Sequence, residues 1–277
     1  MWKKIMATAA VATAVIFAVA FMGCQQEEEG PPLPSLATMT MDLSTFGESA
    51  NAALKLGKAD GVGPKSNFNN AAFRVGWLNL SIAGALAGPV FVLGLALTDS
   101  PSWDNGVWTW DVSGKQGGHE HQALLKAWFD GNLKEGVWLN LEMQVTCTGC
   151  KVPTEDFLWY TGRFHTVEQK GHWQFFNPEI AQEDRTFVRI DYEVTDNTHK
   201  SLTFTNLRTD GHENAGDIIE YIVDADLAHV SVHDAGDGID YVVEWSLSTG
   251  SGVVEVPDYN EGEPACWDSS QQNIECP

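Results

Sequence analysis

The chain has 277 residues, and 43% of them are hydrophobic, which is enough to build a core and excludes a wholly disordered protein. Its formal net charge of −22 repels nucleic-acid phosphates and anionic lipid headgroups, so we expect no nucleic-acid partner. Such acidity is typical of a soluble, self-repelling surface; a calcium ion or a basic partner is the alternative.

The N-terminus has the pattern of a secretory signal peptide. Lys3 and Lys4 form a short basic start, and an uncharged stretch rich in Ala, Val, Ile and Phe extends to Gly23. It ends at Phe21-Met22-Gly23-Cys24, which resembles the lipobox of bacterial lipoproteins, although Phe21 and Met22 replace the usual Leu and small residue. The resemblance implies cleavage after residue 23 and a lipid on Cys24. An uncleaved transmembrane anchor and an ordinary signal peptide are the alternatives.

The segment that follows, 24–35, is acidic and rich in proline, which predicts a flexible tether. The residue after the cysteine is Gln25, not Asp, and in the lipoprotein family this implies the outer membrane. We therefore expect a signal peptide (1–23), a tether (24–35) and one β-rich domain (36–277) that ends in the tail 257–277. The membrane is the expected partner, through the lipid, and the sequence names no protein partner.

Four further cysteines form two local pairs. Export places them in an oxidising compartment, so we expect disulfides between Cys147 and Cys150 and between Cys266 and Cys276, the second closing the tail. The Cys-x-x-Cys spacing also occurs in redox dithiols, but here it follows a strand pattern and does not open a helix. A zinc site built from the four thiols is a further alternative. We expect neither a metal nor a cofactor.

The segment 75–97 carries no charge and is long enough to span a bilayer. However, it contains Pro89 and several glycines, and proline breaks or kinks a helix. Trp77, Leu78, Ile82 and Leu86 recur near helical spacing. We therefore expect two short helices, about 68–87 and 89–97, packed in the interior of the fold in place of a transmembrane helix.

From residue 106 onward the pattern is that of β-strands. Hydrophobic and polar residues alternate in 137–145, 187–194 and 240–247, as in strands with one buried and one wet face. Turn sequences such as Asp210-Gly211 and Asp237-Gly238 separate the runs. The spacing predicts about nine or ten strands between residues 106 and 248. We expect a mainly β fold: an antiparallel up-and-down meander, curved or a half-open barrel, around short helices at about 67–97.

This architecture resembles periplasmic lipoprotein carriers and mycobacterial lipid carriers, in which a curved sheet and helices enclose an apolar cavity. The resemblance is architectural, and no motif residues carry it. It implies a hydrophobic small-molecule ligand. From the sequence pattern itself, we expect Trp77, Leu86, Phe91 and inward-facing strand residues to line such a cavity. A structural or interaction lipoprotein of the cell surface, without a ligand, is the main alternative. An enzyme that acts on envelope polysaccharide is the third.

The sequence holds no known catalytic signature, such as a nucleophile elbow, a phosphate loop, a dinucleotide fingerprint or a zinc-protease helix. We therefore expect no catalytic residues and no enzymatic activity. His119 and His121 would share a strand face and could begin a metal site whose third ligand the sequence does not name, although exposed strand histidines are the simpler interpretation. Asp191 and Glu193 could flank a sugar, as paired carboxylates do in glycosidases, but an acidic chain produces such pairs by chance.

Tryptophan is abundant, with eleven residues in the chain. Trp138 stands out because its place between Val137 and Leu139 puts it on the polar face of its predicted strand. An exposed tryptophan can mark a contact site. Packing beneath a loop or a second layer would explain it as well.

Overall fold

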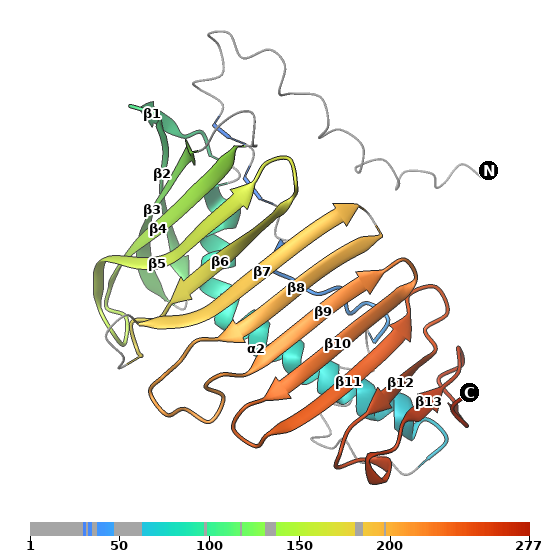
Figure 1. The fold of residues 1–277 in the computed structure, drawn as a ribbon. Helices are drawn as coiled ribbons and strands as arrows, with labels where there is room; N and C mark the ends of the chain where they lie inside the picture. The colour runs from blue at the N-terminus through green and yellow to red at the C-terminus, as the bar shows by residue number, and fades with distance from the viewer. Residues whose placement is uncertain are drawn as a thin grey trace, which may run out of the picture.

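Figure 1 shows the computed structural model of the chain. It describes residues 30–31, 33–34, 38–46, 63–96, 99–116, 118–130, 137–180, 185–196 and 198–277. The predicted signal peptide, Cys24 and most of the predicted tether lie outside the described residues.

The described residues form one antiparallel sheet of fourteen strands, in which every strand pairs with its neighbours in sequence. The sheet does not close into a barrel, since β1 and β14 are its two edges. The strands are β1 (Ser102–Asp104), β2 (Val107–Gln116), β3 (His119–Asp130), β4 (Trp138–Thr148), β5 (Thr154–His165), β6 (Lys170–Phe176), β7 (Thr186–Asp196), β8 (His199–Asn206), β9 (Ile218–Asp224), β10 (Leu227–Asp234), β11 (Ile239–Ser246), β12 (Gly252–Glu255), β13 (Ala265–Trp267) and β14 (Asn273–Ile274). The predicted mainly β meander is confirmed, because strands β2 to β11 follow one another between residues 107 and 246.

The alternating sequence pattern produces a sheet with two different faces. In β4, Leu139, Leu141 and Met143 are buried, while the residues between them are partly exposed. The register carries this pattern across the sheet, since Leu139 faces Phe164 in β5 and Phe164 faces Gly171 in β6. One face of the sheet is therefore apolar and covered, and the opposite face, here called the outer face, meets solvent.

One helix, α2 (Ser66–Ala96), covers the apolar face and contacts β12 to β14 near one end of the sheet and β2 and β3 near the other (Figure 1). The prediction of two helices separated at Pro89 is wrong, because α2 continues through this proline. Leu86 and Leu93 are buried on either side of it, and their packing outweighs the hydrogen bond that proline removes. Among the described residues, no helix combines the length and apolarity needed to cross a membrane.

The segment 38–46 also packs on the apolar face of the sheet. At its start, the hydroxyl of Thr38 accepts a hydrogen bond of 3.2 Å from the indole N–H of Trp173 in β6. Its end contacts β11, where the ring of Phe46 meets that of Trp245 edge-on at 4.9 Å between centroids. Three of its apolar side chains are buried: Met39, Met41 and Phe46. The chain itself therefore occupies part of the space that the sequence assigned to a ligand.

The core on this face is rich in aromatic side chains. The largest fully buried ones are Trp173, Trp245, Trp267, Tyr160, Tyr221, Phe46, Phe68 and Phe175. They pack against one another, as in the contact of 5.4 Å between the ring centroids of Tyr160 and Trp173. Less than 2% of each of these side chains is exposed, so the described part of the core is closely packed around them.

Candidate functional site

The residues predicted to line an apolar cavity do not share one environment. Leu86 is buried, but Trp77 is 57% exposed and so does not line a buried interior. The backbone of Phe91 belongs to α2, while its side chain lies outside the described residues. Periodicity placed Trp77 and Leu86 on one helix, but it could not show which part of the helix surface the sheet covers.

A groove of about 440 Å³ lies on the outer face of the sheet, across β4 to β8. Ten residues line it: Trp138, Arg163, Lys170, Gly171, His172, Asp191, Tyr192, Glu193, Ser201 and Thr203. The lining combines one indole, cationic groups, carboxylates and hydroxyls. It is therefore a polar site on the face opposite the predicted cavity.

The strand register explains why these residues meet. In one row across the sheet, Arg163 faces His172, His172 faces Asp191, and Asp191 faces Thr203. Since side chains two residues apart share a face, a parallel row forms beside it. That second row runs from Trp138 through His165, Lys170 and Glu193 to Ser201. The groove thus lies over two adjacent polar rows.

One end of the groove is formed by stacked side chains of β4 and β5. The guanidinium carbon of Arg163 lies 4.6 Å from the centre of a Trp138 ring, within range of a cation–π interaction. Asp130 holds the same guanidinium through Nη2 at 3.3 Å. The ring of His165 meets Trp138 edge-on, with 5.0 Å between centroids. These contacts fix the orientation of Trp138.

Burial and neighbouring charged side chains set the protonation states of His172 and Lys170 in the groove. Arg189 donates two hydrogen bonds to the Asp191 carboxylate, at 2.7 and 2.6 Å. Partial burial lowers the pKa of His172, and the positive charge of Arg189 lowers it further. The hydrogen bond to Glu168 raises the pKa of Lys170. At neutral pH the groove therefore offers a neutral imidazole, which both donates and accepts, beside a charged ammonium.

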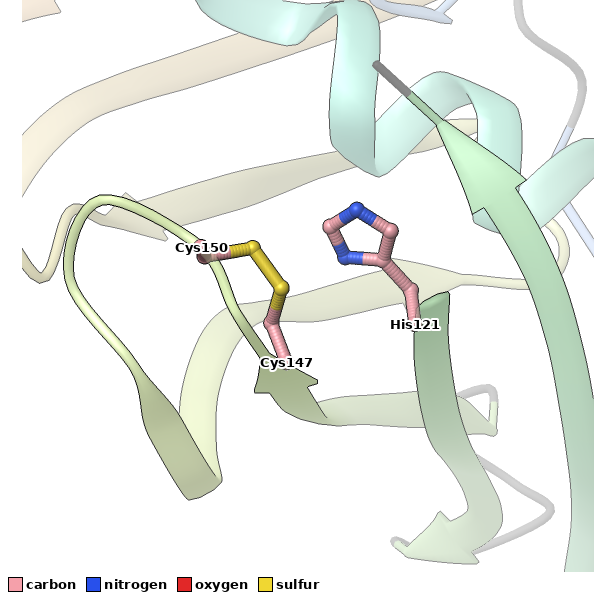
Figure 2. Close-up of side chains that lie close together, drawn as sticks. All are labelled: His121, Cys147 and Cys150. Atoms are coloured by element: carbon pink, nitrogen blue, oxygen red, sulfur yellow. A yellow bond between two sulfur atoms is a disulfide. The ribbon is translucent and has the colours of Figure 1, made fainter. Parts of the chain in front are cut away.

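Both predicted cysteine pairs lie at disulfide distance and form bonds, Cys147 with Cys150 and Cys266 with Cys276. Figure 2 shows that His121 of β3 lies beside the first disulfide, at the end of β4. One ring nitrogen of His121 and the two sulfur atoms all lie within 4.8 Å of one another. The sequence identified this histidine but not its neighbours, because they come from the next strand.

The other polar motifs form ordinary strand and turn structures. His229 and His233 of β10 each contact a carboxylate of β11: Glu244 at 2.8 Å and Asp240 at 2.6 Å. Asp234 accepts backbone N–H bonds within the turn that joins these strands, at 3.0 Å from Gly236 and from Asp237. Residues 235–238 therefore form the turn of a hairpin, as the Asp237-Gly238 sequence predicts.

Sequence reasoning found part of the groove. Trp138 was singled out for its polar-face register, and Asp191 and Glu193 as a carboxylate pair; all three line the groove. It missed Arg163, Lys170 and His172, because their proximity depends on pairing between strands. The sequence did contain one sign of them: in their alternating segments, all three occupy positions that face outward.

No protein-family model, no curated protein and no solved structure matches this chain. A fold alone does not define an activity, so the chemistry of the groove is the basis for a function.

Proposed function

We propose that the protein is anchored by a lipid on Cys24 to the outer membrane of a bacterial cell and acts there as a binding protein without catalytic activity. The lipobox-like sequence supports the anchor. The two cysteine pairs at disulfide distance are what an exported domain would contain.

The ligand we propose is a saccharide of the cell envelope, bound in the groove of the outer face. The main support for a saccharide ligand is the alignment of two polar rows beside the Trp138–Arg163 stack. Sugar hydroxyls donate and accept hydrogen bonds, and the groove supplies both kinds of partner, from Arg163 and Lys170 to Asp191 and Glu193.

The dimensions of the groove agree with this ligand class. Its volume of about 440 Å³ lies within the range of small-molecule sites, roughly 300–1,000 Å³. It also combines an aromatic side chain with a few convergent polar groups, as such sites do. The cationic Arg163 and Lys170 of β5 and β6 lie beside the carboxylates Asp191 and Glu193 of β7, so the groove does not select for a polymer of one charge.

Isothermal titration tests the proposal with a panel of oligosaccharides that includes N-acetylglucosamine oligomers and maltooligosaccharides. The protein is purified with Cys24→Ser to remain free of lipid. At least one sugar should bind, and Trp138→Ala should weaken its affinity tenfold or more, about 1.4 kcal/mol. Trp77→Ala is the matched control, because it removes an exposed tryptophan from α2, which covers the opposite face of the sheet and contributes no residue to the groove lining. Equal affinity in both variants would reject the groove as the site.

Carriage of a hydrophobic ligand on the apolar face is the second candidate function. The observation that favours it is that Tyr160, Trp108 and Trp245 each keep a buried polar atom with no hydrogen-bond partner. A ligand's polar atom would satisfy such a group, but it would have to enter a core that Met39, Met41 and Phe46 of segment 38–46 already help to fill. Native mass spectrometry and organic extraction of the purified protein test this. Co-purified lipid would support carriage, and its absence would leave the groove as the better candidate.

A further inference from the structure

We propose that His121, Cys147 and Cys150 form a redox-gated site for a thiophilic metal ion, Zn²⁺ or Cu⁺. In the disulfide state the site is closed to metal, and reduction opens it. The proposal rests on the clustering of one imidazole and two sulfur atoms within 4.8 Å of one another (Figure 2). It is independent of the groove, because none of the three residues lines it.

Local structure brings the three ligands together. The register of β3 and β4 places His121 directly opposite Cys147. Gly149 has a φ of 84°, a left-handed conformation that lets the chain turn sharply and return Cys150 to Cys147. Two cysteines separated by two residues are the usual half of a structural zinc site.

The distances suit a metal once the sulfur–sulfur bond is broken. Zinc binds sulfur at about 2.3 Å and imidazole nitrogen at about 2.0–2.1 Å, so tetrahedral ligand atoms lie roughly 3.3–3.8 Å apart. The present separations are within 4.8 Å, and small side-chain rotations would therefore complete the site. His119 lies against the same turn, with Nδ1 3.6 Å from the position that a Cβ on Gly149 would take. The fourth ligand is this imidazole or a water molecule.

Stabilisation alone is a weak reason for this disulfide. It joins residues only three apart, whereas Cys266 and Cys276 are ten apart, and a shorter loop constrains the unfolded chain less. Cys150 is also partly exposed, while Cys147 is only 4% exposed. Cys150 is therefore the more accessible partner, which suits a disulfide that is opened and closed.

The opening step is a thiol–disulfide exchange with a dithiol donor. A donor thiolate attacks Sγ of Cys150, the more exposed of the two cysteines, the sulfur–sulfur bond breaks, and Cys147 leaves as a thiolate. The donor's second thiolate then attacks the donor sulfur of the mixed disulfide, which releases Cys150 as a thiolate and leaves the donor as a disulfide. Two electrons have moved to the protein. The metal then binds both thiolates and the neutral imidazole, while any protons they carried pass to solvent.

Competition with a chromophoric chelator tests the site on the full mature chain with Cys24→Ser. After reduction with a phosphine, one Zn²⁺ should bind per chain, and the oxidised protein should bind it at least about 100-fold more weakly. Substituting Co²⁺ should give thiolate-to-metal absorption in the reduced protein only. Equal zinc binding in both states, or no thiolate absorption after reduction, would overturn the proposal without any variant.

Variants assign the ligands. His121→Ala should lower the affinity of the reduced protein at least about tenfold, and Cys147→Ser with Cys150→Ser should abolish the absorption. The control for thiols is Cys266→Ser with Cys276→Ser, and the control for histidine is His233→Ala; both should retain the metal. Loss of binding in the controls, or full binding in His121→Ala, contradicts the assignment.

Discussion

The side chain of Asn273, in the last strand, caps the helix that begins at Ser66. Its Oδ1 accepts the backbone N–H of Asn67 at 3.1 Å, and its Nδ2 donates to the Ser66 hydroxyl at 2.8 Å. The first N–H groups of a helix have no partner within the helix, so a polar group from elsewhere stabilises them. The edge of the sheet and the start of α2 are thus joined through residues more than 200 positions apart.

Replacing the cap should therefore weaken the whole fold. We expect Asn273→Ala to lower the free energy of unfolding by about 1 kcal/mol, within a range of roughly 0.5–2 kcal/mol for helix caps. Urea denaturation followed by circular dichroism measures it. Glu275→Ala, an exposed change in the same tail, should have little effect. Equal stability of the two variants would show that the cap contributes nothing.

The disulfide between Cys266 and Cys276 holds the tail in which Asn273 lies. Cys276→Ser should lower the free energy of unfolding by about 2–3 kcal/mol, because a loop of this length is no longer constrained in the unfolded chain. It should also weaken the cap, so its effect and that of Asn273→Ala should not add. A double-mutant cycle by urea denaturation tests this; strict additivity would mean that the tail stays in place without the bond.

Replacing Tyr160, unlike the two substitutions above, should not lower the free energy of unfolding. Its hydroxyl is buried and has no hydrogen-bond partner, and burial raises its pKa far above the usual value. Removing an unsatisfied buried group recovers its desolvation cost, so Tyr160→Phe should leave stability unchanged or raise it by about 1 kcal/mol. The matched control is Tyr221→Phe, which removes a hydroxyl that donates to the Asp42 carbonyl at 3.3 Å. It should lower stability, and a similar loss in Tyr160→Phe would contradict the account.

His199 should make stability depend on pH. Its hydrogen bond to Asp196 raises its pKa above the usual 6.5, and hydrogen bonds from Thr198 and His199 hold the pKa of Asp196 well below 3.8. The contribution of His199 to the free energy of unfolding is complete below pH 6.5 and is lost as the pH rises through the raised pKa. The contribution of Asp196 is lost only in strong acid. His199→Ala should therefore destabilise the protein at about pH 5 and much less at about pH 9. The urea denaturation midpoints of both proteins at these two pH values measure the effect. A larger loss of stability at the alkaline pH would contradict the prediction.

Arg163 is expected to act through its planar stack on Trp138 as well as through its charge. Arg163→Lys keeps the charge but loses the stacked geometry and the fork of donors. Calorimetry should show that both Arg163→Ala and Arg163→Lys weaken saccharide binding, by about tenfold for alanine and somewhat less for lysine. If lysine restored full affinity, charge alone would account for the role of Arg163.

The fold was largely predictable because its information is local. Period-2 alternation in 137–145 defines the buried face of β4, and short turns leave the meander as the simplest topology. The cysteine pairs are also local, which is why their partners could be named. Pro89 misled the helix prediction, since tertiary burial of Leu86 and Leu93 overrides a local breaker.

The candidate sites were less predictable because they depend on contacts between strands. Arg163 and His172 meet only through the pairing of β5 with β6, and His121 meets Cys147 only through that of β3 with β4. A shift of one residue in either register would send these side chains to the opposite face. Alternation shows which residues face outward, but not which of them face one another.

Amide chemical-shift mapping shows whether the outer face of β4 to β8 binds a saccharide. The isotope-labelled protein with Cys24→Ser is titrated with the tightest-binding oligosaccharide of the panel. We predict saturable shifts concentrated around Trp138, Arg163, His172 and Asp191, which in Trp138→Ala require at least about tenfold more sugar to saturate. No binding by any sugar, or shifts confined to α2 and the apolar face, would show that the groove is not a saccharide site.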